Sequence, residues 1–154
     1  MYPAKHLNTN LEFSMLVPSI LLIDDDEVDA EAVRRSFRLH QLPNQIIHAL
    51  DGLEALDLLC GKAAIPPLPK PYIILLDINL PRMNGLEFLR QLRQDPDLKS
   101  SVVFVLTTSN RPEDKVAAYQ KQVAGYILKE NVGQNFRDAI RLLKDYQTVV
   151  ILPD

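Results

Sequence analysis

The sequence predicts a doubly wound α/β fold, in which helices cover both faces of one parallel, five-stranded sheet. Short apolar runs of strand length alternate along the chain with longer segments of helical periodicity, which is the pattern of consecutive βα units. Two of the runs, residues 72–76 and 102–106, are apolar at every position rather than at alternate positions. Such runs are typical of strands buried on both faces, so we expect helices above and below the sheet.

Local signals mark the ends of the predicted elements. Pro112 suits the first turn of a helix, and Gly61 suits a helix C-terminus because glycine adopts positive φ without strain. The expected strands are residues 20–23, 45–49, 72–76, 102–106 and 125–128, and the expected helices are residues 27–40, 52–61, 85–94, 112–122 and 135–146. Five strands joined by right-handed crossovers favour the flavodoxin-like strand order 2-1-3-4-5.

Three segments lie outside this alternation. Residues 1–17 show no sustained period and are expected to be an N-terminal extension, residues 18–146 to form the domain, and residues 147–154 to be an apolar tail. Four prolines between residues 66 and 71 indicate a stiff, extended loop. That loop is either a surface insertion or a docking site for a partner.

Composition argues against several classes of protein. The 17 Lys and Arg residues against 20 Asp and Glu give a net charge of −3, which does not favour binding to nucleic acid or anionic lipid. The single cysteine, Cys60, excludes an internal disulfide and is expected in the core. No apolar run reaches the roughly 18–20 residues of a membrane span, and the first residues lack the apolar stretch of a signal peptide. We therefore expect a cytoplasmic protein that binds neither nucleic acid nor membranes.

Polar residues follow four of the five predicted strands. Asp24 and Asp25 follow the first strand, Asp77 the third, Thr107 the fourth and Lys129 the fifth. Ligands of open α/β sheets bind beyond the carboxyl ends of the strands, so these side chains are expected to share one crevice. Three converging carboxylates repel one another unless a cation joins them, and their hard oxygen atoms suit Mg²⁺. A phosphoryl group fits among metal, ammonium and hydroxyl, with Asp77 as the nucleophile that accepts it.

Each of these residues, taken alone, has a structural alternative. Residues Asp24 to Asp26 could cap the helix that follows them, and Asp77 could be a turn residue. Thr107 could cap the next helix, and Lys129 could be a solvated charge at a strand end. The joint arrangement, one matching residue at each of four strand ends, favours the functional interpretation.

The sequence resembles the receiver domain of two-component response regulators. The resemblance covers roughly residues 18–146 and is carried by the motifs ILLIDDD (20–26), IILLDINLPRMNGLEFL (73–89), VVFVLTTSN (102–110) and GYILK (125–129). The intervals between Asp77, Thr107 and Lys129 also match the family.

The resemblance implies a role for each matching residue. Asp77 would accept the phosphoryl group from a histidine kinase, and Lys129 would form an ion pair with it. Mg²⁺ would be bound by Asp25, Asp77 and the backbone carbonyl of Asn79, and through a water by Asp24. Thr107 would be the switch hydroxyl, and Tyr126 the aromatic residue whose rotamer follows it; a half-buried strand aromatic is the alternative for Tyr126.

Two departures from the family pattern stand out. Glu130 follows Lys129 where the family usually has a cis proline, so the lysine lacks that backbone constraint. The interval from Asp25 to Asp77 is several residues longer than in the plainest receivers, and the proline loop accounts for the difference.

A narrower resemblance points to partners. The long loop, LTTSN after the fourth strand and the tail YQTVVILP (146–153) resemble the small stand-alone regulators paired with bacterial and cyanobacterial phytochromes. The implied partner is a light-sensing histidine kinase of the bacteriophytochrome type. The apolar tail residues Val149, Val150, Ile151 and Leu152 either pack on the chain's own surface or form a homodimer contact.

Two other functions compete with a phospho-accepting switch that is not an enzyme. A phosphohydrolase with a strand-end aspartate nucleophile needs a second acid two positions later, and Asn79 occupies that position. A scaffold receiver that is never phosphorylated remains an alternative, because Glu130 could disable Lys129.

Overall fold

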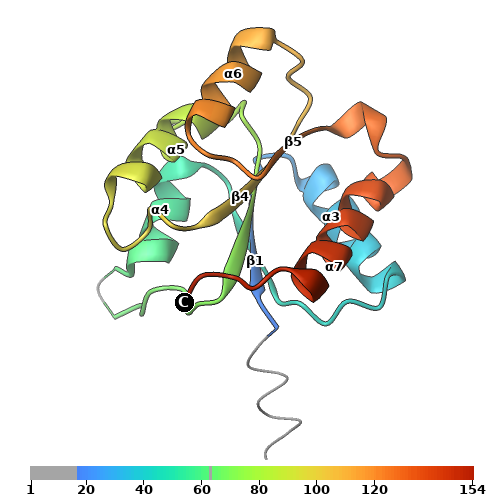
Figure 1. Ribbon diagram of the computed structural model, residues 1–154, viewed down its shortest axis with the longest axis horizontal. Helices are drawn as coiled ribbons and strands as arrows, with labels where there is room; N and C mark the ends of the chain where they lie inside the picture. Colours follow the sequence, from blue (N-terminus) through green and yellow to red (C-terminus); the bar gives the residue numbers. More distant parts are fainter. Residues whose placement is uncertain (1–16, 63) are drawn as a thin grey trace, which may run out of the picture.

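The protein forms one five-stranded parallel sheet in the order β2-β1-β3-β4-β5, which confirms the predicted fold class (Figure 1). The computed structural model describes residues 17–62 and 64–154; the predicted extension, residues 1–17, lies outside them except for its last residue. The strands are β1 (Ser19–Ile23), β2 (Ile46–Ala49), β3 (Tyr72–Leu76), β4 (Val102–Thr107) and β5 (Gly125–Leu128). All five residues of β3 are buried, as its uninterrupted apolar sequence predicts.

Helices cover both faces of the sheet (Figure 1). The helices are α3 (Glu27–Leu39), α4 (Gly52–Cys60), α5 (Gly85–Gln94), α6 (Pro112–Gln120) and α7 (Arg137–Val149), with short 3₁₀ turns η1 (Lys129–Asn131) and η2 (Gln134–Phe136) before α7. Side chains of α3 and α7, including Phe37 and Ile140, pack on one face of the sheet. Side chains of α4, α5 and α6, including Leu59 and Phe88, pack on the other.

The strand register aligns the carboxyl ends of the central strands. Ile23 of β1 pairs with Leu76 of β3, and backbone hydrogen bonds continue one residue further: the Asp77 amide donates to Ile23 O (2.9 Å) and the Asp24 amide to Ala49 O (3.0 Å). Gly85 begins α5 directly against the backbone of Asp77, where a Cβ atom would collide with the Asp77 carbonyl oxygen. The main chain around Asp77 is therefore held by two neighbouring strands and a helix.

Two sequence-based expectations are corrected by the structure. Cys60, expected in the core, is exposed, because α4 buries Gly52, Ala55 and Leu59 and the next residue points about 100° away from that face. The last helix runs from Arg137 to Val149 rather than over residues 135–146, so the predicted tail begins as helix. Its start is delayed because Asn135 and Phe136 have positive φ.

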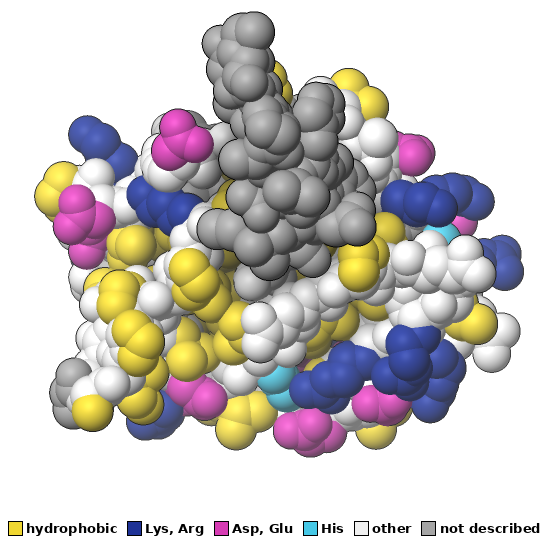
Figure 2. Space-filling model, turned by 90° about the horizontal axis from the view of Figure 1, so that it is seen from below, with side chains coloured by type: hydrophobic (Ala, Val, Ile, Leu, Met, Phe, Trp, Pro, Cys, Tyr) yellow, Lys and Arg dark blue, Asp and Glu magenta, His cyan; other side chains and the backbone are white. Residues whose placement is uncertain are grey.

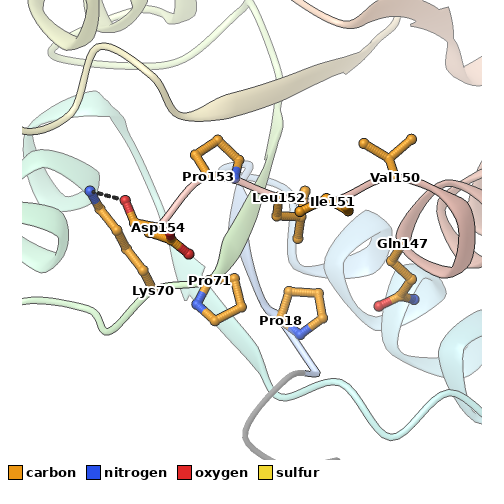
Figure 3. Close-up of a pocket in the computed structure, with 9 residues that line it drawn as sticks. All are labelled: Pro18, Lys70, Pro71, Gln147, Val150, Ile151, Leu152, Pro153 and Asp154. Carbon is orange, nitrogen blue, oxygen red and sulfur yellow. Dashed lines mark hydrogen bonds between the residues drawn. The ribbon is translucent and has the colours of Figure 1, made fainter.

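The C-terminal tail lies across the end of the molecule opposite the carboxyl ends of the strands. Leu152 packs against the core on the α3/α7 side, and Lys70 donates a hydrogen bond to the main-chain oxygen of Asp154 (3.0 Å; Figure 3). Residues of the tail, with Pro18 and Pro71, line a groove of about 540 Å³. Hydrophobic side chains gather on part of this end of the molecule, with Lys and Arg side chains concentrated on another part (Figure 2). Val149 and Ile151 are 80% and 96% exposed.

Among residues 17–62 and 64–154, we find no helix with the length and apolar character needed to cross a membrane.

Candidate functional site

The carboxyl ends of β1 and β3 bring three acidic residues together. One carboxylate oxygen each of Asp24, Asp25 and Asp77 can be chosen so that all lie within 4.8 Å of one another. Asp24 and Asp77 are buried, whereas Asp25 is exposed at the mouth of the site. The topology thus brings together the acidic residues that were predicted to converge at the strand ends.

Helix capping was the structural alternative for Asp24 to Asp26, and Asp26 is the residue that takes this role. Its Oδ1 accepts hydrogen bonds from the amides of Val28 (2.8 Å) and Asp29 (3.1 Å) at the N-terminus of α3. Asp24 and Asp25 are left to face the crevice.

The ammonium group of Lys129 lies at the centre of the acidic cluster. Its Nζ atom is 2.7 Å from Asp29 Oδ2, 2.8 Å from Asp24 Oδ2 and 3.0 Å from Asp77 Oδ2. Burial alone would lower the pKa of Lys129, but the hydrogen bonds to Asp24 and Asp29 and the charge of Asp77 raise it well above its ordinary value. The lysine is therefore charged, and its ion-pair partners are Asp24, Asp29 and Asp77. The neighbouring side chain of Glu130 is exposed.

Asp77 is oriented through both of its carboxylate oxygens. Oδ1 accepts hydrogen bonds from the hydroxyl of Thr107 (2.6 Å) and the backbone amide of Asn79 (3.3 Å), while Oδ2 accepts from Lys129. Both oxygens of the buried Asp77 carboxylate are therefore fixed in direction.

Asp24 contributes a buried carboxylate. Burial raises the pKa of Asp24, and the hydrogen bonds from Lys129 and the Asp26 amide offset part of that effect. Because burial of the charged form is unfavourable, a second cation beside Lys129 would stabilise this arrangement.

Tyr126 is connected to Thr107 through Ser109. The Ser109 amide donates to Thr107 Oγ1 (3.2 Å), and the Tyr126 hydroxyl donates to the Ser109 carbonyl oxygen (2.9 Å). Tyr126 is half-buried on β5, and burial raises the pKa of its hydroxyl. The loop after β4 therefore contacts both residues that the family resemblance assigns to a switch.

The donor set fits a hard divalent cation. The three carboxylates supply oxygen ligands only, and the exposed position of Asp25 leaves room for coordinated waters. Asp24, Asp25 and Asp77 are the residues placed to share such an ion.

Two polar contacts were missed by sequence reasoning. Asp29 was not assigned to the site, although it lies in the first turn of the helix that begins directly after Asp24, Asp25 and Asp26. His48, at the end of β2, donates from Nε2 to the carbonyl oxygen of Asp24 (2.6 Å), and nothing in its local sequence signals that contact.

A parallel sheet with this strand order and a strand-end site of acids, threonine and lysine defines a receiver domain. The family model for the response regulator receiver domain matches residues 20–141, and the chain belongs to that family.

Within this family, the chain is similar over most of its length to Rcp1. Response regulator Rcp1 of Synechocystis is 33% identical over 129 residues, which is 84% of this chain and 86% of Rcp1. The crystal structure of the Mn²⁺-bound form of Rcp1 has a TM-score of 0.74 at 32% identity and covers 89% of this chain and 99% of Rcp1.

Two further crystal structures are similar over the same share of the chain. The phosphorylated cyanobacterial phytochrome response regulator RcpA has a TM-score of 0.79 at 29% identity, covering 89% of this chain and 99% of RcpA. RPA3017, a response regulator in red light signalling of R. palustris, has a TM-score of 0.79 at 28% identity with the same coverage. The chain is thus related to phytochrome response regulators.

Proposed function

We propose that this receiver accepts a phosphoryl group on Asp77 from a sensor histidine kinase, in a reaction that requires Mg²⁺. The observation that carries the proposal is the environment of Asp77: one carboxylate oxygen is bound by Thr107 and the other by Lys129, beside Asp24 and Asp25. A hydroxyl and an ammonium that already contact the nucleophile are placed to bind the oxygens of a group attached to it.

The reaction is a transfer between two nucleophiles. A carboxylate oxygen of Asp77 forms a bond to phosphorus as the bond from phosphorus to the kinase histidine nitrogen breaks, and the electron pair of that bond remains on the imidazole. The product is an acyl phosphate on Asp77. Bound Mg²⁺ neutralises charge on the phosphoryl oxygens; Asp25, Asp77 and the Asn79 carbonyl would hold it directly and Asp24 through a water. Lys129 pairs with a phosphoryl oxygen, and Thr107 donates its hydroxyl to another.

The signal would leave the site through the loop after β4. When Thr107 turns to the phosphoryl group, its link to Ser109 changes, and the hydrogen bond from Tyr126 to the same residue is affected. The surface formed by α6, β5 and α7 would then differ between the two states.

The proposed kinase is of the phytochrome type. The support is similarity to phytochrome response regulators and to a regulator in red light signalling. The test is phosphotransfer from a purified, autophosphorylated phytochrome kinase, with transfer to Asp77→Ala as the negative control. Transfer that is no faster than from a histidine kinase of another class would contradict this partnership.

We also propose a homodimer, located in the cytoplasm, that uses the apolar tail. Val149, Val150 and Ile151 remain exposed, whereas Leu152 packs mainly on its own chain. Removing residues 150–154 leaves α7 whole and should lower the mass measured by light scattering from dimer to monomer. An unchanged mass would contradict a tail-mediated dimer.

The net charge of −3 gives no support to binding of nucleic acid.

An unphosphorylated scaffold is the second candidate. It is favoured by the engagement of Lys129 with three carboxylates, together with Glu130 in the position next to it.

Intact-mass analysis after incubation with acetyl phosphate and Mg²⁺ separates the two candidates. One added phosphoryl group is expected on the native chain and on Asp145→Ala, which removes an exposed carboxylate of α7, and none on Asp77→Ala. The absence of an adduct on the native chain, with Mg²⁺ binding verified by titration, would favour the scaffold.

A further inference from the structure

Asp29 makes the shortest of the three contacts to Lys129, at 2.7 Å, although it follows no strand end. It lies in the first turn of α3, and its backbone amide is anchored to the N-cap residue Asp26. Its side chain is 25% exposed, compared with 3% for Asp24 and 8% for Asp77. Asp29 therefore approaches the ammonium from the rim of the crevice, on a rigid helical support.

Lys129 has no hydrogen-bond donor left over in this state. A lysine ammonium carries three N–H donors and no acceptor, and here three carboxylates accept from it. A phosphoryl oxygen can bind Lys129 only by displacing one of these partners or by sharing a proton with it. When Asp77 is phosphorylated, the hydrogen bond from Lys129 to Asp77 can be replaced by one to the phosphoryl group. The carboxylate of Asp29 still competes with the phosphoryl group for the ammonium.

The contact of Asp29 with the site passes through Lys129. Within residues 17–62 and 64–154, the acids placed to share a metal ion are Asp24, Asp25 and Asp77, without Asp29. Four carboxylates and one ammonium nevertheless give the crevice a formal excess of three negative charges. A dianionic phosphoryl group adds to that excess. The negative charge of Asp29 therefore opposes the phosphoryl group in two ways: it repels the group directly, and it holds the Lys129 ammonium that would otherwise pair with the group.

We propose that Asp29 is a positioning residue that retains the Lys129 ammonium on α3 and so weakens its pairing with a phosphoryl group on Asp77. This inference rests on the proposed function. Because no proline follows Lys129, the contact with Asp29 on α3, rather than the backbone of the following loop, fixes the lysine in the resting state. Phosphorylation must weaken that contact between Lys129 and Asp29.

The test is a titration with beryllium fluoride, a mimic of the phosphoryl group, at a concentration of Mg²⁺ that saturates each variant. Asp29→Asn keeps the shape of the side chain and removes its charge, and the affinity for beryllium fluoride should rise about threefold or more. Glu27→Gln is the matched control, because it removes an acid from the same helical turn that contacts His48 (3.9 Å) rather than Lys129. The side chain of Glu27 is 72% exposed. The control should leave the affinity within about 1.5-fold of the native value, as expected for a screened surface charge.

A second variant tests whether Asp29 acts through the lysine. In a Lys129→Met background, where only direct charge repulsion remains, Asp29→Asn should give a clearly smaller gain in affinity than in the native background. An equal gain in both backgrounds would overturn the proposal, as would an unchanged or weaker affinity of Asp29→Asn in the native background. Failure of the native protein to bind the mimic would instead refute the proposed function. Cooperative urea unfolding of each variant establishes that it is folded.

Discussion

The Thr107 hydroxyl donates a 2.6 Å hydrogen bond to Oδ1 of Asp77, across the carboxyl ends of the neighbouring strands β3 and β4. The same oxygen of Thr107 accepts from the amide of Ser109, whose carbonyl accepts from Tyr126. A chain of hydrogen bonds thus leads from the proposed phosphoryl acceptor to the surface of β5. A change in the chemical state of Asp77 alters the partner of the first hydroxyl in that chain.

Removing the Thr107 hydroxyl should separate phosphorylation from the conformational response. We expect Thr107→Ala to be phosphorylated on Asp77 but to lose most of the NMR shift changes that beryllium fluoride with Mg²⁺ induces at Tyr126 and α6. Thr107→Ser, which keeps the hydroxyl, should retain them. Thr108→Ala is the control, because Thr108 is the exposed neighbour. Full shift changes in Thr107→Ala would show that the hydroxyl is not the link.

Tyr126→Phe removes one partly buried hydrogen bond and leaves the ring in place. The free energy of unfolding should fall by about 0.5–1.5 kcal/mol, the usual net value of one such bond. Urea denaturation measures this loss, and the rate of phosphorylation by acetyl phosphate should stay close to native. A large fall in that rate would place Tyr126 in the reaction itself.

Asp51 links the N-terminus of α4 to the loop that follows Asp77. Its Oδ1 accepts from the Glu54 amide (3.0 Å), and its Oδ2 accepts from Arg82 (2.6 Å). Although burial acts in the opposite direction, these bonds hold the pKa of Asp51 below its ordinary value. A lowered pKa contributes stability that is complete above the ordinary value of 3.8 and is lost as the pH falls through the folded-state value.

Asp51→Ala should therefore lower the free energy of unfolding at pH 7 by about 1–2 kcal/mol, as loss of a helix cap does. The difference from the native protein should shrink as the pH falls below 3.8. Urea denaturation at several pH values measures both effects. The exposed-site variant Asp145→Ala should change little, and a pH-independent difference for Asp51→Ala would contradict the assignment.

Arg93 joins α5 to the end of α6 and to the loop before β4. Its guanidinium group donates to four carbonyl oxygens, those of Lys99, Ser101, Lys121 and Gln122, at 2.7–3.0 Å. Arg93→Met keeps the aliphatic stem and should lower the free energy of unfolding by about 2 kcal/mol, because several carbonyls lose a charged donor. Arg90→Met on the same helix, where the arginine is exposed, should cost much less. Equal losses would show that the four bonds contribute little.

The sequence predicts most of this molecule because its strands are signalled locally. The uninterrupted apolar run of β3 and the polar residues directly after the strands needed only the general topology of parallel sheets to place Asp24, Asp77 and Lys129 in one crevice. Residues at strand ends are positioned by the sheet itself, so short-range patterns are enough to find them.

The features that sequence reasoning missed depend on tertiary contacts. Asp29 and Lys129 are 100 residues apart, and their ion pair is visible only when α3 is docked against the end of β5. The exposure of Cys60 depends on which residues of α4 face the sheet. The extension of α7 to Val149 depends on the packing of its last turns, which includes an edge-to-face contact between the rings of Tyr146 and Phe104 with centroids 4.9 Å apart.

The most direct test of the central claim locates the phosphoryl group. Borohydride reduces an acyl phosphate on aspartate to the alcohol, so the phosphorylated protein, reduced and digested, should contain homoserine at position 77 and aspartate at positions 24, 25 and 29. Peptide mass spectrometry reads each position separately. Homoserine at position 77, dependent on both Mg²⁺ and the phosphoryl donor, is the predicted result; homoserine at another acid of the crevice, or at none, would contradict the assignment of Asp77 as the acceptor.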